Sequence, residues 1–379
     1  MGLPIHNIMI YFAVFASSLL LSVFIASLHP QGWSRRNDVT AVQSMHERSV
    51  SRLGGVAVVG SAFAILVIFL PGTHDGLAGP TLFASALPVF IAGVLEDLGR
   101  HVRPRDRFLA AMLSGAAFIA LFEQWLTNTK VPVLDLAMQW APFAMAFSIL
   151  LAAGVSHAFN LVDGLNGLAG FIGVSAALCL AYMAHEADLS DHRGVLLLLA
   201  CAICGFLALN FPFGRIFLGD AGAYVIGHSL VWLSISILCL ASSITPWAML
   251  LIFFWPVADT LLAILRRLTS GRGVAHPDRL HFHHLVLRSI EVTLFGRRRR
   301  SLTNPIATLV LLPLAVAPMV TGVLLMSHTS GAALACLFFA SLFLLAYKRG
   351  VAVTSRMSSR RAVRRVVAGR RSDIALHKE

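Results

Sequence analysis

Apolar residues follow one another in long runs along this chain, and most polar residues lie in the segments between the runs. A helix that crosses a bilayer needs about 20 predominantly apolar residues. The sequence therefore predicts an all-α, polytopic membrane helical bundle of about eleven transmembrane helices. The expected spans are 8–28, 54–71, 79–95, 108–126, 141–159, 168–184, 195–213, 221–242, 246–265, 303–326 and 331–347, with a loop or a short interfacial helix over 127–140.

The composition favours the same class. Hydrophobic residues make up 57% of the 379 positions and charged residues only 13%, whereas a soluble domain usually carries roughly 25% charged residues. These values and a mean hydropathy of +0.78 exclude a water-soluble globular enzyme and a disordered protein. The five cysteines lie inside apolar runs, so no disulfide framework is expected.

The net charge of +12 is distributed unevenly. If the N-terminus lies outside, all but two of the 30 Lys and Arg residues fall on the cytoplasmic side, the exceptions being Lys130 and Arg193. Positive residues favour that side. We therefore expect an uncleaved first helix, a membrane-embedded domain over 1–347 and a basic cytoplasmic tail over 348–379. Anionic headgroups explain the basic runs without a nucleic-acid partner.

Two polar clusters on the expected cytoplasmic side contain carboxylates. Glu96 and Asp97 end the third span and precede Arg100, Arg103, Arg105 and Arg107, which suits either a charged helix end or a site for a divalent cation and phosphates. Asn160, Asp163 and Asn166 follow at three-residue steps, which would place them on one face of a helical turn. The alternative for this second cluster is a polar connecting loop.

Two further clusters lie on the same side. Asp220 stands between glycines at the start of the eighth span, where it could cap the helix or bind a metal. The segment 277–288 holds His281, His283 and His284 beside Arg279, and suits a phosphate pocket better than a surface histidine cluster or a zinc site.

Asp259 lies within the ninth span, two turns before Arg266. This spacing favours a structural ion pair or a supporting role over direct catalysis. Buried acids are costly in a membrane and need a reason. Because all four clusters share one face with the basic residues, we expect transfer of a phosphorylated group between a cytosolic nucleotide and a lipid.

Six short motifs occur in a particular order along residues 8–347: RLGG, LEDL, NLVDGLNGLAG, FLGDAG, PVAD and PDRLHFHH. Each motif is weak alone, but their order and placement are specific. In these motifs the chain resembles the polyprenyl-phosphate N-acetylhexosamine-1-phosphate transferases, glycosyltransferase family 4.

The resemblance implies transfer of a sugar-1-phosphate from a UDP-N-acetylhexosamine to undecaprenyl phosphate, with release of UMP, at the cytoplasmic face of the bacterial inner membrane. It implies Mg²⁺, with Mn²⁺ as an alternative, on Asp220 and Asn160. Catalytic roles are expected for Glu96, Asp97, Asp163, Asp220, His281, His283 and His284, and substrate binding for Arg52, Asn160, Asn166, Arg266 and Arg279. The product would start a lipid-linked surface glycan, and a homodimer is compatible with this assignment.

Several positions depart from the family pattern. Glu96 stands where Asp is usual, His157 where Asn is common, and Tyr224 where small residues are common. Asn166 replaces an Asp of the muramoyl-pentapeptide branch, which disfavours that branch. Direct displacement is the favoured mechanism, with a covalent route through Asp97 left open. The rival classes are a membrane transporter that uses the buried acids and a membrane anchor.

Overall fold

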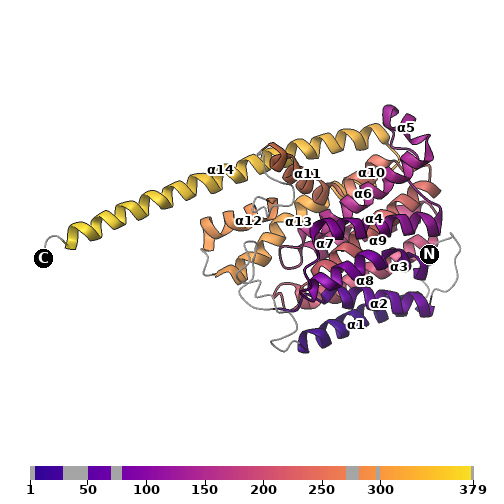
Figure 1. Cartoon of the computed structure of the whole chain (residues 1–379), viewed down its shortest axis with the longest axis horizontal. Coiled ribbons are helices and arrows are strands. Elements are labelled where there is room, and N and C mark those ends of the chain that lie inside the picture. Colours follow the sequence, from indigo (N-terminus) through magenta and orange to yellow (C-terminus); the bar gives the residue numbers. More distant parts are fainter. Residues whose placement is uncertain (1–4, 29–49, 70–78, 270–280, 296–298, 377–379) are drawn as a thin grey trace.

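The structure is a computed structural model that describes residues 5–28, 50–69, 79–269, 281–295 and 299–376 (Figure 1). These residues form helices and no strand, which confirms the all-α class. The helices are α1 (Ile5–Ser27), α2 (Gly54–Phe69), α3 (Gly79–Asp97), α4 (Pro104–Phe122), α5 (Pro132–Met138), α6 (Ala141–Val162), α7 (Leu168–Glu186), α8 (Ser190–Asn210), α9 (Gly219–Leu240), α10 (Pro246–Ile252), α11 (Phe254–Thr269), α12 (Phe282–Ile290), α13 (Arg300–Leu324) and α14 (Thr329–Leu376), with a π-helical segment, η2 (Glu291–Phe295).

Each expected span except 246–265 corresponds to one helix in the described residues, but fewer helices meet the requirements for crossing a bilayer. In the described part of the chain, eight are long and apolar enough, or nine if α10 and α11 count as one span. The expected count of eleven included α2, which is short, and α4, which begins with a charged turn. The segment 127–140 contains the short helix α5. The protein is therefore a multi-pass membrane protein.

The expected span over 246–265 is not one continuous helix. The chain breaks between α10 and α11, and the two helices are bent by 79°. Pro256 explains why the break is tolerated there, because proline has no N–H to donate to the carbonyl of Ile252 one turn earlier. The bend directs α11 toward the end of the bundle from which α14 emerges (Figure 1).

Helix α9 is the centre of the bundle and is buried along almost its whole length. Small residues let its first turn approach two neighbours closely. A Cβ built on Gly55 would lie 2.2 Å from the Gly222 nitrogen, and one on Gly93 would lie 2.5 Å from the Ala221 nitrogen. Small residues at helix contacts are the usual means of close packing in membranes. They bring the start of α2 and the end of α3 against the start of α9.

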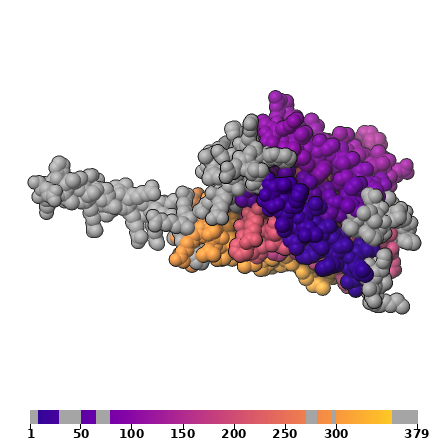
Figure 2. All heavy atoms as spheres, turned by 90° about the horizontal axis from the view of Figure 1, so that it is seen from below, coloured from indigo at the N-terminus to yellow at the C-terminus, as the bar shows by residue number. Residues whose placement is uncertain are grey.

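The outer helices frame this centre. Figure 2 shows α1 on the outer surface of the bundle, and α1 packs on α8 and α2. Helix α14 extends over 48 residues and leaves the bundle as a long projection at the end where α12 also lies (Figure 1). It passes through position 348, the expected boundary of the basic tail, without a break.

Candidate active site at the start of α9

The first turn of α9 is capped by a carboxylate from another helix. Asp97, the last residue of α3, accepts hydrogen bonds from the backbone N–H groups of Asp220 and Ala221, both at 2.9 Å. The first N–H groups of a helix have no partner within it, and the helix dipole favours a negative charge there. Asp97 thus joins α3 to α9 and fixes the direction in which the Asp220 side chain leaves the helix.

Asp220 is held by two arginines. Its Oδ1 accepts a hydrogen bond from the Arg52 guanidinium at 3.1 Å, and its Oδ2 pairs with Arg107. Arg52 also lies 3.6 Å from Asp97, so one cation serves both acids. The two Asp220 oxygens thus face arginines from other elements and not the N–H groups of α9. The simple helix-cap interpretation of Asp220 is therefore wrong.

Asp163 approaches the same first turn from α6. The Gly219 N–H and the positive charge of Arg52 stabilise its carboxylate, whereas burial and the nearby Asp220 charge oppose ionisation. Burial has the largest effect and raises the pKa of Asp163 to about 7. Three carboxylates from α3, the end of α6 and α9 therefore converge around Arg52.

The expectation that Asn160, Asp163 and Asn166 share one helix face is wrong. Helix α6 ends at Val162, and Asp163 leaves the helical conformation with φ −73° and ψ 62°. Asn160 belongs to the last turn of α6, and its carbonyl accepts from the Asp163 N–H at 3.3 Å. Asn166 lies in the connection to α7 and faces elsewhere. Gly167, with a φ of 78°, allows the change of direction before α7, which the three-residue spacing does not reveal.

A second carboxylate site lies where α11 meets α12. Asp259 Oδ1 accepts from the Phe282 N–H at 3.0 Å, and Asp259 Oδ2 lies 3.1 Å from His281 Nδ1 and 3.8 Å from His283 Nδ1. Asp259 thus supports the histidines. The ion pair with Arg266, which its spacing suggested, is replaced by this contact. Burial lowers the pKa of His283 and lowers that of His284 to about 2.

The two carboxylate sites meet at the loop after α6. A Cβ built on Gly164 would lie 2.5 Å from His283 Nε2, so the imidazole lies directly against this glycine. Gly164 follows Asp163, which faces Asp220. The loop therefore has the acid–arginine cluster on one side and the histidine cluster on the other.

Asn166 is anchored by neighbours outside these clusters. Its N–H donates to Asn304 Oδ1 and its carbonyl accepts from Thr308 Oγ1, both at 2.8 Å. Its side-chain Nδ2 donates to the Pro212 carbonyl at 2.9 Å, whereas its buried Oδ1 has no partner among the residues that the structure describes. The expected contact of Asn166 with a nucleotide stays a prediction, in which Asn166 Oδ1 would accept the hydrogen bond.

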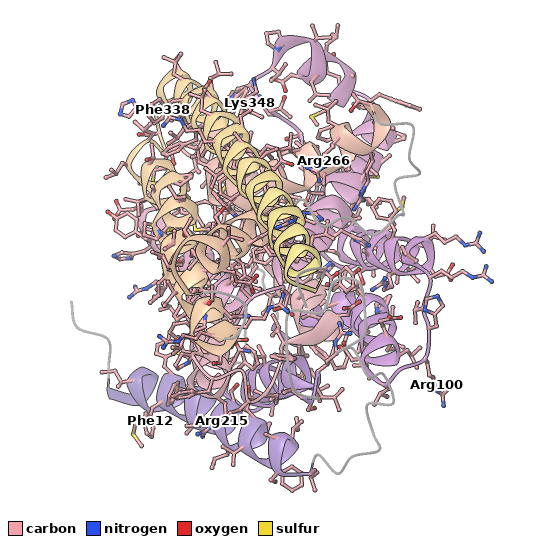
Figure 3. All side chains as sticks on the ribbon, turned by 90° about the vertical axis from the view of Figure 1, so that its left-hand side faces the viewer. Phe12, Arg100, Arg215, Arg266, Phe338 and Lys348 are labelled. Atoms are coloured by element: carbon pink, nitrogen blue, oxygen red, sulfur yellow. The ribbon has the colours of Figure 1, made fainter. Side chains whose placement is uncertain are left out.

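The remaining expected residues lie in different places. Glu96 accepts from the Val102 N–H at 2.8 Å and shapes the loop between α3 and α4. Arg266 donates to the Tyr347 hydroxyl at 2.6 Å, which places it beside α14, as Figure 3 shows. Arg279 lies outside the described residues.

The sequence reasoning did not assign three residues that the structure places at or next to these clusters. Arg107 had been grouped with its neighbouring arginines, and its contact with Asp220 distinguishes it from Arg105, which is exposed and pairs with Asp106. Asn304 and Thr308 are polar residues one turn apart in an apolar run. That spacing was a usable signal, because a buried polar pair needs partners.

Oxygen donors are the ligands available for a cation here. In the described ranges, no three His, Cys, Asp or Glu side chains are grouped closely enough to hold a metal by themselves. Mg²⁺ commonly takes one or two carboxylates and completes its shell with substrate phosphates and water. Asp220 and Asp163, which both face Arg52 in this structure, could provide these two carboxylates. Asn160 lies one turn from Asp163.

The fold and the site together define a multi-pass helical membrane protein with a buried carboxylate–arginine centre at one end of the bundle. Residues 80–238, from α3 to α9, match the family model described as glycosyl transferase family 4. This match includes Asp97, Asp163 and Asp220, and ends before the histidine cluster.

Named relatives agree with the family match. The chain is 28% identical to a decaprenyl-phosphate N-acetylglucosaminephosphotransferase of Mycobacterium tuberculosis (strain ATCC 25618 / H37Rv), over 74% of each chain. It is 29% identical to an undecaprenyl-phosphate alpha-N-acetylglucosaminyl 1-phosphate transferase of Yersinia pestis, over 64% of this chain and 67% of that one. A protein of the same name from Thermotoga maritima is 27% identical, over 65% and 70%. Residues 80–238 of the chain are therefore similar to glycosyl transferase family 4, and a transporter finds no support.

Proposed function

We propose that the protein transfers an N-acetylhexosamine-1-phosphate from a UDP-sugar to a polyprenyl phosphate and releases UMP. The observation that carries this proposal is the convergence of Asp97, Asp163 and Asp220 around Arg52 at the start of α9. The names of the relatives supply the acceptor class and make N-acetylglucosamine the first sugar to test. The product would start a lipid-linked surface glycan.

The reaction joins two anions, so charge is its main obstacle. An oxygen of the acceptor phosphate attacks the phosphorus that carries the sugar, and the bond from that phosphorus to the UMP oxygen breaks. UMP leaves with the electron pair, and the sugar ends on a lipid diphosphate. Arg52 and Arg107 are placed to neutralise phosphate oxygens once Asp220 turns to a cation. The acceptor is already ionised near neutral pH, so no strong base is required.

Asp220 and Asn160, with Asp163 beside them, would hold Mg²⁺ through oxygen atoms. Bound there, the ion would supply charge stabilisation to the diphosphate and the leaving UMP. The chain's own residues position the donor and acceptor, which is the largest contribution in phosphoryl transfer generally. His281 and His283, oriented by Asp259, offer imidazole groups on the other side of the Asp163 loop.

The contacts of Asp97 favour direct displacement over a covalent route. Both of its oxygens already accept backbone N–H groups of α9, and Arg52 lies beside one of them. A nucleophile would have to give up these bonds and leave the helix end uncapped. Asp97 therefore acts as a support for Asp220, and a phospho-sugar trapped on the enzyme without acceptor would contradict this.

The proposed setting is the cytoplasmic face of the bacterial inner membrane. The distribution of Lys and Arg supports this orientation, because all but two of the 30 basic residues would then lie inside. A cytosolic nucleotide sugar could reach the site from that side. A homodimer stays a prediction.

The test is a transfer assay with the purified protein, undecaprenyl phosphate, Mg²⁺ and a panel of UDP-sugars, with lipid product and UMP measured. We expect Asp220→Asn to lower turnover about 10³-fold, because a charged oxygen at the site of greatest charge is lost. Asp106→Asn is the matched control, since Asp106 is an exposed acid near the same end. Near-normal turnover of Asp220→Asn would contradict the assignment.

A further inference from the structure

Two polar residues of α13 hold one residue of the loop between α6 and α7. Asn304 and Thr308 lie one helical turn apart, and they are 3% and 0% exposed. Their side chains bind the N–H and the carbonyl of Asn166, each at 2.8 Å. A buried amide or hydroxyl is costly without a hydrogen bond, and both of these groups make theirs to the same residue.

The opposite side of the loop is held as well. The Gly167 N–H donates to Asn210 Oδ1 at 2.6 Å, and Asn210 Nδ2 donates to the Ile216 carbonyl at 2.7 Å. The loop is therefore fixed between α13 and the turn that leads into α9. Two successive residues, Asn166 and Gly167, have their backbone bound by side chains distant in the sequence.

This anchoring matters because of what the loop carries. Asp163, three residues before Asn166, faces Asp220 and Arg52, and Gly164 supports His283. The break at Asp163 ends α6, so the helix cannot fix the direction of the loop beyond that point. The contacts with Asn304 and Thr308 do so instead, from an element with no acidic residue.

We infer that Asn304 and Thr308 are positioning residues that hold the loop 163–167 in register, with Asp163 toward Asp220 and Gly164 toward His283. The inference rests on the proposed function for its effect on turnover. The two residues touch no reacting atom, and they act through the backbone of Asn166.

The central variant is Thr308→Val, which keeps the shape of the side chain and removes the hydroxyl donor. We expect faster hydrogen exchange at Asn166 and Gly167, and turnover per folded enzyme about tenfold lower with the KM for the UDP-sugar nearly unchanged. Thr308→Ser keeps the donor and should recover turnover to within about twofold. Asn304→Leu removes the other contact and should reproduce both effects, which provides a second variant if Thr308→Val folds poorly.

The matched control is Thr321→Val on the same helix. Thr321 is half-buried, and its hydroxyl donates to the Ala317 carbonyl of its own helix at 2.9 Å in an exposed hydrogen bond, so exchange and turnover should stay unchanged. Wild-type-like exchange in Thr308→Val, or unchanged turnover per folded enzyme despite faster exchange, would overturn the inference while the transferase stands. A wild-type protein without any transfer would overturn the proposed function and this inference together.

Discussion

The acid–arginine cluster and the histidine cluster share one arrangement, a carboxylate at the start of a helix, but the side chains around the carboxylate differ. In each, a carboxylate binds the backbone at the start of another helix: Asp97 caps α9, and Asp259 caps α12. The partners differ, since Arg52 and Arg107 surround the first site and the imidazoles of His281 and His283 surround the second. Arginine stays charged at any working pH, whereas histidine can lose its proton.

This difference predicts how each site tolerates the loss of its carboxylate. Removing Asp97 would leave two N–H groups of α9 and part of the Arg52 charge without a partner. Removing Asp259 would leave imidazoles and one backbone N–H without their acceptor, but no guanidinium. The acid–arginine cluster, which also holds three carboxylates where the histidine cluster holds one, should therefore be the more sensitive of the two.

The largest effect is expected for Asp97→Ala. Each buried donor left without a partner costs about 1–3 kcal/mol, and the direction of Asp220 is lost as well. We expect turnover to fall about 10³-fold and the unfolding temperature in detergent to drop. Asp97→Asn keeps one acceptor for the helix end and should lie between Ala and wild type. Equal turnover of Asp97→Ala and wild type would contradict the claim that this cap orients Asp220.

A smaller effect is expected for Asp259→Ala. The Phe282 N–H and His281 lose their acceptor, but no arginine is left without a partner, so we expect turnover to fall about 10- to 100-fold. Parallel assays of Asp259→Ala and Asp97→Ala measure the comparison directly. If Asp259→Ala lost as much turnover as Asp97→Ala, the sensitivity of a site would not depend on whether arginine or histidine faces its carboxylate.

The smallest effects concern stability against pH, and they have opposite signs in the two clusters. Burial holds the pKa of His283 below its usual value, so at acid pH the unfolded chain binds a proton that the folded protein does not. Wild-type stability should therefore fall as the pH drops below about 6.5, the ordinary histidine pKa. His283→Gln should weaken this dependence, as measured by thermal unfolding in detergent from pH 5 to 8.

Asp163 should act in the other direction. Because its pKa is raised to about 7, the folded protein keeps a proton that the unfolded chain loses near pH 3.9, and stability falls as the pH rises between these values. Asp163→Asn should therefore raise the unfolding temperature at pH 8 in buffer without Mg²⁺, by roughly 1–2 °C for each kcal/mol regained in a chain of 379 residues. A lower unfolding temperature for Asp163→Asn would show that the attraction of Arg52 for the carboxylate outweighs the cost of its burial.

The sequence anticipated most of the acids and histidines of both clusters but not their partners. Asp97, Asp163, Asp220 and the histidines stand out as polar residues at the ends of apolar runs. Which acid caps which helix does not follow from spacing, since Asp97 and Asp220 are 123 positions apart. The same holds for Asp259, whose sequence neighbour Arg266 turned instead to Tyr347 of α14.

The sequence by itself determined the all-helical class, the positions of the helices and the set of candidate polar groups. Those properties depend on local composition, because a bilayer-spanning helix satisfies its own backbone and needs only an apolar run. Only the tertiary structure decided the 79° break between α10 and α11, the turn of the chain at Asp163 and the contacts of Arg107, Asn304 and Thr308. These depend on which helices pack together, and close packing along α9 is a property of the whole bundle.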